Sequence, residues 1–258
     1  MNSKYNIKRF FIFIITLHLC SITAVAAEEF AAVLGWSKRV ELSTPVNGIV
    51  QKVFSQPGKI VAKGEVLVQL DPRSFKADLK FAKAKLKNAS EQSLEAKREL
   101  DRQLDMYDRS MLSEHDLQTA KNNYTAAQSN YLQAQAELTK AKLNLEYSAV
   151  RSPFNAIVIS STAVKGQVVT SEITPPTILV IVAEAKRMLA RFYAPNTKVN
   201  ELVLNQGVKV MVAGESYQAK VLRVALELEP LQPGYAVDVI FDSKDKVLRA
   251  GQKATIDL

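Results

Sequence analysis

The chain has 258 residues, of which 47% are hydrophobic and 23% are charged, as in an ordinary globular protein of one large or two or three small domains. Its formal charge of +8 raises the question of nucleic-acid binding, and the answer depends on where the cations lie. Cys20 is the only cysteine, which excludes a fold held together by disulfide bonds within the chain.

Residues 1–27 have the pattern of a secretory signal peptide. An uncharged run from Phe10 to Ala27 ends in small residues and follows three cations, Lys4, Lys8 and Arg9. The alternative is an uncleaved membrane anchor, because these 18 uncharged residues approach the ~20 needed to span a bilayer. The small residues and the acidic residues after them favour cleavage near Glu28, which lowers the charge to +5. We therefore expect a periplasmic protein.

A short sequence segment rich in β-branched residues occurs twice in the chain. Residues 44–50 (TPVNGIV) align with residues 152–158 (SPFNAIV) at an offset of 108, and Gly58 meets Gly166 at the same offset. Glycines after such runs indicate turns between short strands. Neither copy has enough apolar surface to be stable alone, so we expect the two copies to be halves of one β domain. The halves are residues 39–72 and 148–184.

Residues 73–147, between the two copies, are predicted to form a long antiparallel helical hairpin. No glycine or proline interrupts the chain from Phe75 to Tyr147. The two helices are expected to meet at residues 107–116, where Ser113 followed by Asp116 resembles a capping box. Apolar and small residues recur at alternating spacings of three and four, which is typical of a coiled coil. The expected seam is Leu79, Ala82, Leu86, Ala89, Ser93, Ala96 and Leu100 on the first helix, and Leu117, Ala120, Tyr124, Ala127, Tyr131, Ala134, Leu138, Ala141 and Leu145 on the second.

Lysines are frequent on the first of these helices. In an exported protein we interpret them as a solvated helix face, so no nucleic-acid partner is expected. The lysines are Lys76, Lys80, Lys83, Lys85, Lys87 and Lys97.

Residues 185–258 are predicted to form a small β-barrel. The segment from Met188 to Gly214 indicates a strand, a short helix after Pro195 and a second strand. Two further segments with strand-like alternation follow, and residues 248–258 close the chain on another strand.

The segment TPVNGIVQKVFSQPGKIVAKGEVLVQLD, residues 44–71, resembles the biotinyl/lipoyl domain. Split by a helical hairpin and followed by β strands, residues 39–258 resemble the periplasmic adaptor proteins, also called membrane fusion proteins. This resemblance implies an elongated α+β chain, with a split lipoyl-like domain (a barrel-sandwich hybrid), an inserted antiparallel coiled-coil hairpin and a β-barrel. Asp71 and Pro72 stand where a carrier domain has its modified lysine, so we expect no cofactor.

A second resemblance lies at the expected tip of the hairpin. Adaptors that dock on outer-membrane channels tend to show Arg-x3-Leu-x6-Ser across this tip. Arg102, Met106 and Ser113 stand at that spacing, with methionine in place of leucine. Methionine keeps an apolar and adaptable contact of similar volume. The resemblance thus implies that these three residues bind the channel, although they also fit a solvated arginine and a simple helix cap.

The favoured function is a non-enzymatic adaptor that links an inner-membrane exporter to an outer-membrane channel, assembled as a ring, expected to be a hexamer. Apart from the histidine in residues 1–27, His115 is the only histidine, so neither a catalytic set nor a metal cluster is expected. The alternatives are a periplasmic coiled-coil scaffold for another partner and a lipoyl or biotinyl carrier subunit. The exporter class is left open among the resistance-nodulation-division, ABC and major-facilitator types. The chain stops where many adaptors continue into a membrane-proximal domain, which we expect to be short or absent.

Overall fold

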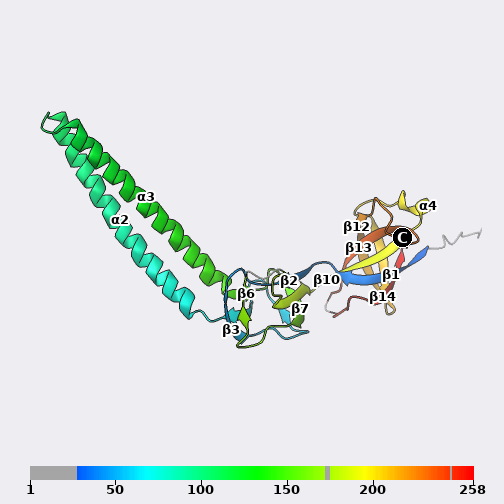
Figure 1. The fold of residues 1–258 in the computed structure, drawn as a ribbon. Coiled ribbons are helices and arrows are strands. Elements are labelled where there is room, and N and C mark those ends of the chain that lie inside the picture. The colour runs from blue at the N-terminus through cyan, green and yellow to red at the C-terminus, as the bar shows by residue number, and fades with distance from the viewer. Residues whose placement is uncertain (1–27, 172–174, 245) are drawn as a thin grey trace, which may run out of the picture. The chain divides into compact units, whose positions relative to one another are not determined.

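The structure is a computed structural model, and it describes residues 28–171, 175–244 and 246–258. The signal-peptide prediction for residues 1–27 lies outside these ranges. The chain forms two compact units (Figure 1). The described residues up to Gly35 join Leu189–Asp242 and Leu248–Leu258 in one unit, and Trp36–Met188 with Ser243–Val247 form the other. Within the described residues, no helix combines the length and the hydropathy that a membrane crossing requires.

The β part of the second unit consists of two four-stranded sheets, and each sheet takes strands from both sides of the hairpin. The first sheet has the order β2 (Arg39–Leu42), β9 (Val180–Glu184), β7 (Ala156–Ser161) and β4 (Ile60–Val61). The second has the order β6 (Ala149–Arg151), β5 (Val66–Leu70), β3 (Gly48–Val53) and β8 (Val168–Val169). The two halves are therefore interlocked rather than stacked side by side.

The strand register shows that the two halves are related by an internal two-fold. Ile49 on β3 pairs with Val168 on β8, and Ile157 on β7 pairs with Ile60 on β4. The offset of 108 residues carries the first pair onto the second. Gly58 and Gly166 are also equivalent, with φ of +84° and +88°, a conformation that favours glycine. One core contains residues from both halves, including Val50, Leu67, Val158 and Val182.

The hairpin consists of α2 (Arg73–Asp108) and α3 (Glu114–Tyr147). Every residue of the predicted seam is buried or half-buried, which confirms the seam. Ala134 is fully buried in the seam and Ala82, Ala89, Ala120 and Ala141 are buried too, so the helices approach closely. Lys85 Nζ and Glu137 Oε2 form an ion pair between the helices at 2.7 Å. At the base of the hairpin, Phe75 and Leu145 pack into the core of the β domain.

The break between the helices lies at residues 109–113, where the sequence predicted it. Ser113 is the N-cap of α3: its hydroxyl accepts a hydrogen bond from the backbone N–H of Asp116 at 3.2 Å. The same hydroxyl donates to Asp116 Oδ2 at 2.6 Å. Glu114 and Asp116 place negative charge in the first turn of α3, where the helix dipole favours it. The predicted N-cap is therefore confirmed, but the Asp116 carboxylate accepts from the Ser113 hydroxyl and not from its backbone N–H as in a full capping box.

The other unit is a closed six-stranded barrel. Its strand order is β1 (Glu29–Trp36), β10 (Arg187–Ala194), β13 (Tyr235–Asp242), β12 (Glu215–Val224), β11 (Gly207–Val212) and β14 (Lys253–Asp257). The short helix α4 (Asn196–Val199) follows β10. The sequence did not indicate β1, which adds residues before position 39 to the barrel expected at 185–258. The inward side chains of β1, Ala32 and Leu34, are buried.

Candidate functional site

The predicted docking residues all lie at the tip of the hairpin, where α2 ends and α3 begins. Arg102 and Met106 are four residues apart and share one face of α2. The Arg102 side chain is 60% exposed, and its Nη2 forms an ion pair with Glu99 Oε2 at 2.8 Å. Met106 is half-buried. The two motif positions on α2 thus place a cation and, one helical turn beyond it, an apolar side chain near the tip.

Ser113 differs from the other two residues because its hydroxyl is already used by the helix cap. Both of its hydrogen bonds go to Asp116, one as acceptor and one as donor. The hydroxyl oxygen keeps acceptor capacity for one further bond. Ser113 therefore has a structural role as the N-cap of α3, and Arg102 and Met106 have no such capping role.

The turn at the apex adds an apolar residue that the sequence motif does not include. The backbone N–H of Met111 donates to the carbonyl of Met106 at 2.9 Å, which folds the turn back over the last turn of α2. Ser110 supports this turn with a φ of +60°. Met111 is 68% exposed at the apex, and Tyr107, four residues earlier, is also exposed. In the sequence, a methionine among the polar residues of the predicted helix break was the signal that could have identified Met111 as an apolar residue at the apex.

In the barrel, one buried carboxylate joins three neighbouring strands. Asp238 on β13 has a side chain that is only 6% exposed. Arg191 on β10 donates from Nε to Oδ1 at 2.7 Å, and Arg223 on β12 lies with Nη2 2.8 Å from Oδ2. Burial acts to raise the pKa of Asp238, but the hydrogen bonds from Arg191 and Arg223 outweigh it, and the pKa lies below its ordinary value. This cluster fixes the register of the barrel wall.

Asp238→Asn should lower the free energy of unfolding of the barrel by about 2 kcal/mol at neutral pH, since it removes the negative charge that accepts three hydrogen bonds from Arg191 and Arg223. Because the folded pKa of Asp238 is lowered, its contribution is present above the unfolded value of about 3.9 and is lost as pH falls through the folded value. Chemical unfolding of both proteins at pH 7 and at pH 3 measures this difference.

The matched control for this prediction is Asp257→Asn, at a half-buried carboxyl on β14 of the same barrel. We expect the control to have little effect at either pH. A stability gap between wild type and Asp238→Asn that stays the same from pH 7 to pH 3 would contradict the assignment.

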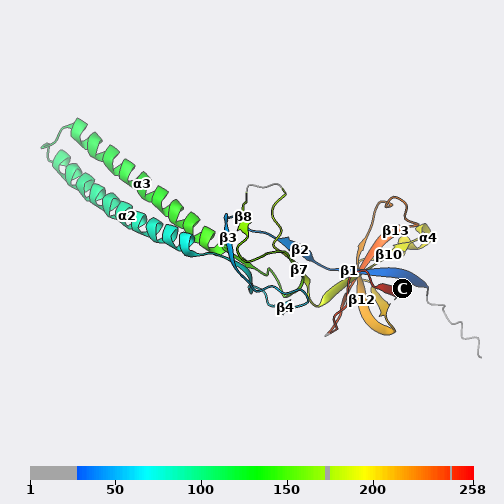
Figure 2. The ribbon, with the colours of Figure 1, turned by 60° about the horizontal axis from the view of Figure 1, so that its bottom comes forward.

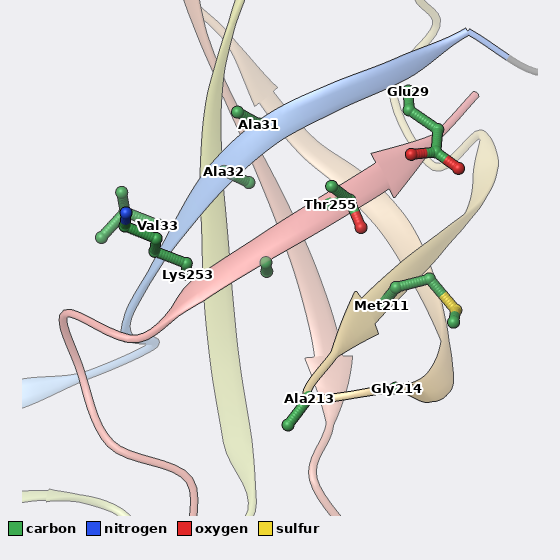
Figure 3. Close-up of a pocket in the computed structure, with 10 residues that line it drawn as sticks. Glu29, Ala31, Ala32, Val33, Met211, Ala213, Gly214, Lys253 and Thr255 are labelled. Carbon is green, nitrogen blue, oxygen red and sulfur yellow. The ribbon is translucent and has the colours of Figure 1, made fainter.

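The barrel has a shallow groove of about 620 Å³ on the outer face of β1, β14 and β11 (Figure 3). Its lining consists mainly of small or apolar side chains, among them Ala31, Val33 and Met211, with Glu29 and Lys253 also present. Among the residues that the structure describes, no three histidine, cysteine, aspartate or glutamate side chains gather as metal ligands.

Comparisons with known proteins agree with this architecture. Residues 38–178 match the family model described as "CzcB-like, barrel-sandwich hybrid domain". The macrolide export protein MacA of Yersinia pestis is 28% identical over 186 residues, which cover 67% of this chain and 49% of that protein. The multidrug resistance protein MdtE of Escherichia coli K12 is 30% identical over 131 residues, covering 51% of this chain and 34% of that protein. The chain therefore spans half or less of the length of these relatives.

Solved structures show the same fold. MacA from Actinobacillus actinomycetemcomitans superposes with a TM-score of 0.69 at 24% identity, covering 89% of this chain and 78% of that chain. A chimera of MacA with the α-hairpin domain of Pseudomonas aeruginosa MexA gives a TM-score of 0.68 at 22% identity, covering 89% and 80%. The fold class predicted from the sequence is confirmed. With a family match over more than half of its residues, the chain belongs to the periplasmic adaptor, or membrane fusion protein, family.

Proposed function

We propose that the protein is the periplasmic adaptor of a tripartite efflux system and links an inner-membrane transporter to an outer-membrane channel without catalysing a reaction. One observation carries this function: an exposed tip is held away from the lipoyl-like domain by a hairpin with a continuous buried seam. The 36 residues of α2 rise about 50 Å at 1.5 Å per residue. Such a hairpin offers reach and a small contact surface, and it has no pocket for a substrate at its end.

The tip supplies the contacts to the channel. Arg102 donates charge-assisted hydrogen bonds to carboxylates or carbonyls of the channel. Met106 and the apical Met111 fill apolar grooves, for which flexible thioether side chains are well suited. Ser113 keeps α3 capped and accepts at most one bond from the partner.

The remaining parts of the proposal concern processing and assembly. Residues 1–27 direct export to the periplasm and are cleaved, and the mature protein assembles as a ring of identical subunits, expected to be a hexamer. The domains are residues 39–72 with 148–184, the hairpin 73–147, and the barrel 185–258 together with β1. The barrel contacts the transporter. The names of the relatives MacA and MdtE, a macrolide export protein and a multidrug resistance protein, support a role in efflux.

Site-directed cross-linking in cells tests this function. Met111→Cys in a Cys20→Ser background places one thiol at the apex of the tip, and Asn130→Cys places one on the exposed middle of α3 as the matched control. We expect the apical thiol, with a short bifunctional reagent, to capture an outer-membrane channel protein identified by mass spectrometry. Capture of the same protein with equal yield from position 130, or from neither position, would refute tip docking.

A further inference from the structure

One end of the barrel is formed by two connecting loops that lie against each other. β10 and β12 end here, and β11 and β13 begin here, so the α4 loop (195–206) and the β12–β13 loop (225–234) share this end (Figure 2). A Cβ added at Gly234 would lie only 2.3 Å from the carbonyl oxygen of Ala194. The backbone N–H of Asn205 donates to the carbonyl of Val221 at 2.8 Å. The two loops are therefore packed closely onto the barrel.

These loops expose large apolar side chains to an unusual degree. Leu226 is 95% exposed, Leu231 is fully exposed and Leu228 is more than half exposed. Scattered exposed leucines are ordinary on a protein surface, but several within one short loop mark an interaction site. We call this set the apolar end. It consists of Leu226, Leu228 and Leu231, with Val203 and Leu204 from the α4 loop.

The β12–β13 loop is held by hydrogen bonds in a conformation that leaves its leucines exposed. The backbone N–H of Gln232 donates to the carbonyl of Glu229 at 3.2 Å and closes a turn over Pro230 and Leu231. Leu231 has a φ of +65° in this turn, a conformation that favours glycine or asparagine. Glu229 ties the turn to the barrel, because it accepts a hydrogen bond from the Tyr193 hydroxyl at 2.9 Å. A branched apolar residue is thus kept in a disfavoured conformation with no burial to compensate for it.

The chain enters the barrel at this same end. Glu29 on β1 pairs with Asp257, which also pairs with Lys209 near the start of β11. Lys198 Nζ at α4 lies 3.3 Å from Glu28 Oε2. The residues that precede Glu28 include the uncharged run from Phe10 to Ala27. During export this uncharged run lies in the membrane, so the end of the barrel that carries Glu28 is the end next to the bilayer until the run is cleaved.

We propose that the apolar end docks on the surface of a lipid bilayer, with Leu226, Leu228 and Leu231 inserted among the headgroups. An apolar loop tip gains free energy when it leaves water for the boundary between headgroups and acyl chains. Acidic groups stand around the leucines, among them Glu227 and Glu201, so attraction to anionic lipid does not drive the contact. Binding should therefore need no anionic lipid and should be insensitive to salt.

The test uses a fluorescent reporter on the full chain. In a Cys20→Ser background, Gln232→Cys is labelled with the environment-sensitive dye NBD next to Leu231, and Asn130→Cys on the hairpin carries the control label. We expect zwitterionic phosphatidylcholine vesicles to shift the emission of the first label to shorter wavelength and doxyl-labelled lipids to quench it, equally at low and high salt. The control label should not respond, and an equal response there would overturn the proposal.

Three variants of the labelled chain separate docking from folding. Leu226→Ser, Leu228→Ser and Leu231→Ser combined should lower the lipid affinity roughly tenfold or more, whereas Leu132→Ser with Leu143→Ser on the hairpin should not change it. Leu231→Gly relieves the positive φ, so its melting temperature should stay the same or rise while its lipid affinity falls.

The remaining outcomes would overturn lipid docking. They are an unchanged affinity in the triple variant, binding that requires anionic lipid and is lost in salt, no vesicle response at all, and a wavelength shift that depends on protein concentration without vesicles. The last of these would show that a second copy of the chain covers the apolar end.

Discussion

Arg102→Asp is expected to remove most of the docking of the hairpin tip on the outer-membrane channel while the protein stays folded. The side chain is 60% exposed, and its only ion pair joins it to Glu99 three residues earlier on the same helix. Such exposed pairs contribute no more than about 0.5 kcal/mol. A charge-assisted hydrogen bond to the partner is worth about 1.5–3 kcal/mol, and reversal of the charge adds repulsion. Docking should therefore weaken at least about tenfold.

Arg98→Asp is the matched control for this prediction. Arg98 lies one helical turn before Arg102 on α2, is exposed, and pairs with Glu95 at 3.2 Å. Both variants make the same change in charge and lose the same kind of ion pair. Drug susceptibility of cells that carry each variant, measured beside the melting temperature of the purified proteins, separates docking from stability. Equal export by both variants at equal stability would show that Arg102 has no part in docking.

Ala134→Glu should open the middle of the hairpin. Ala134 is fully buried in the seam, so a glutamate there has no room and would place a carboxylate against α2 without a partner. Burial of an unpaired charge and overpacking each cost several kcal/mol, about 3 or more together. Most of the stability of a helix in a protein comes from tertiary packing, so the seam provides most of the stability of α2 and α3. We expect a large loss of helical signal and a loss of export, since the tip is no longer presented.

The control is Ala136→Glu, two residues further along α3 on the exposed face. It introduces the same side chain on the same helix, so a general effect of glutamate would appear in both variants. Thermal melting followed by circular dichroism and limited proteolysis of the hairpin measure the effect. Similar melting curves for the two variants would contradict the assignment of Ala134 to the interface between the helices.

The sequence contained enough information for the hairpin and the split β domain, because both depend on local or repeated patterns. The seam follows from the spacing of apolar side chains along each helix, and the internal two-fold follows from the repeat of residues 44–50 at residues 152–158. β1 escaped notice because its outward residues, such as Ala31 and Val33, are as apolar as its inward ones and hide the alternation.

Features formed by residues distant in sequence could not be predicted in this way. Arg191, Arg223 and Asp238 lie on three strands, and only the strand order of the closed barrel brings them together. Met111 and Leu231 resembled ordinary loop residues, and only the structure shows that Met111 is 68% exposed and Leu231 is fully exposed. The tip motif was visible in sequence, but the second hydrogen bond of Ser113 to Asp116, which reduces its part in binding, required the structure.

The interlocked sheets have a consequence for the order in which the chain folds. β5 pairs with β6, although the whole hairpin separates the two strands in sequence. Residues 39–72 therefore cannot complete their sheets until residues 148–184 are available. The entropic cost of closing a loop grows with the logarithm of its length. Once α2 and α3 have zipped together, Pro72 and Ser148 are neighbours, and the remaining closure resembles that of a loop of a few residues. By this logarithmic dependence the folded hairpin lowers the cost of loop closure by about 2 kcal/mol. The hairpin that presents the tip therefore also brings the two halves of the lipoyl-like domain together as they fold.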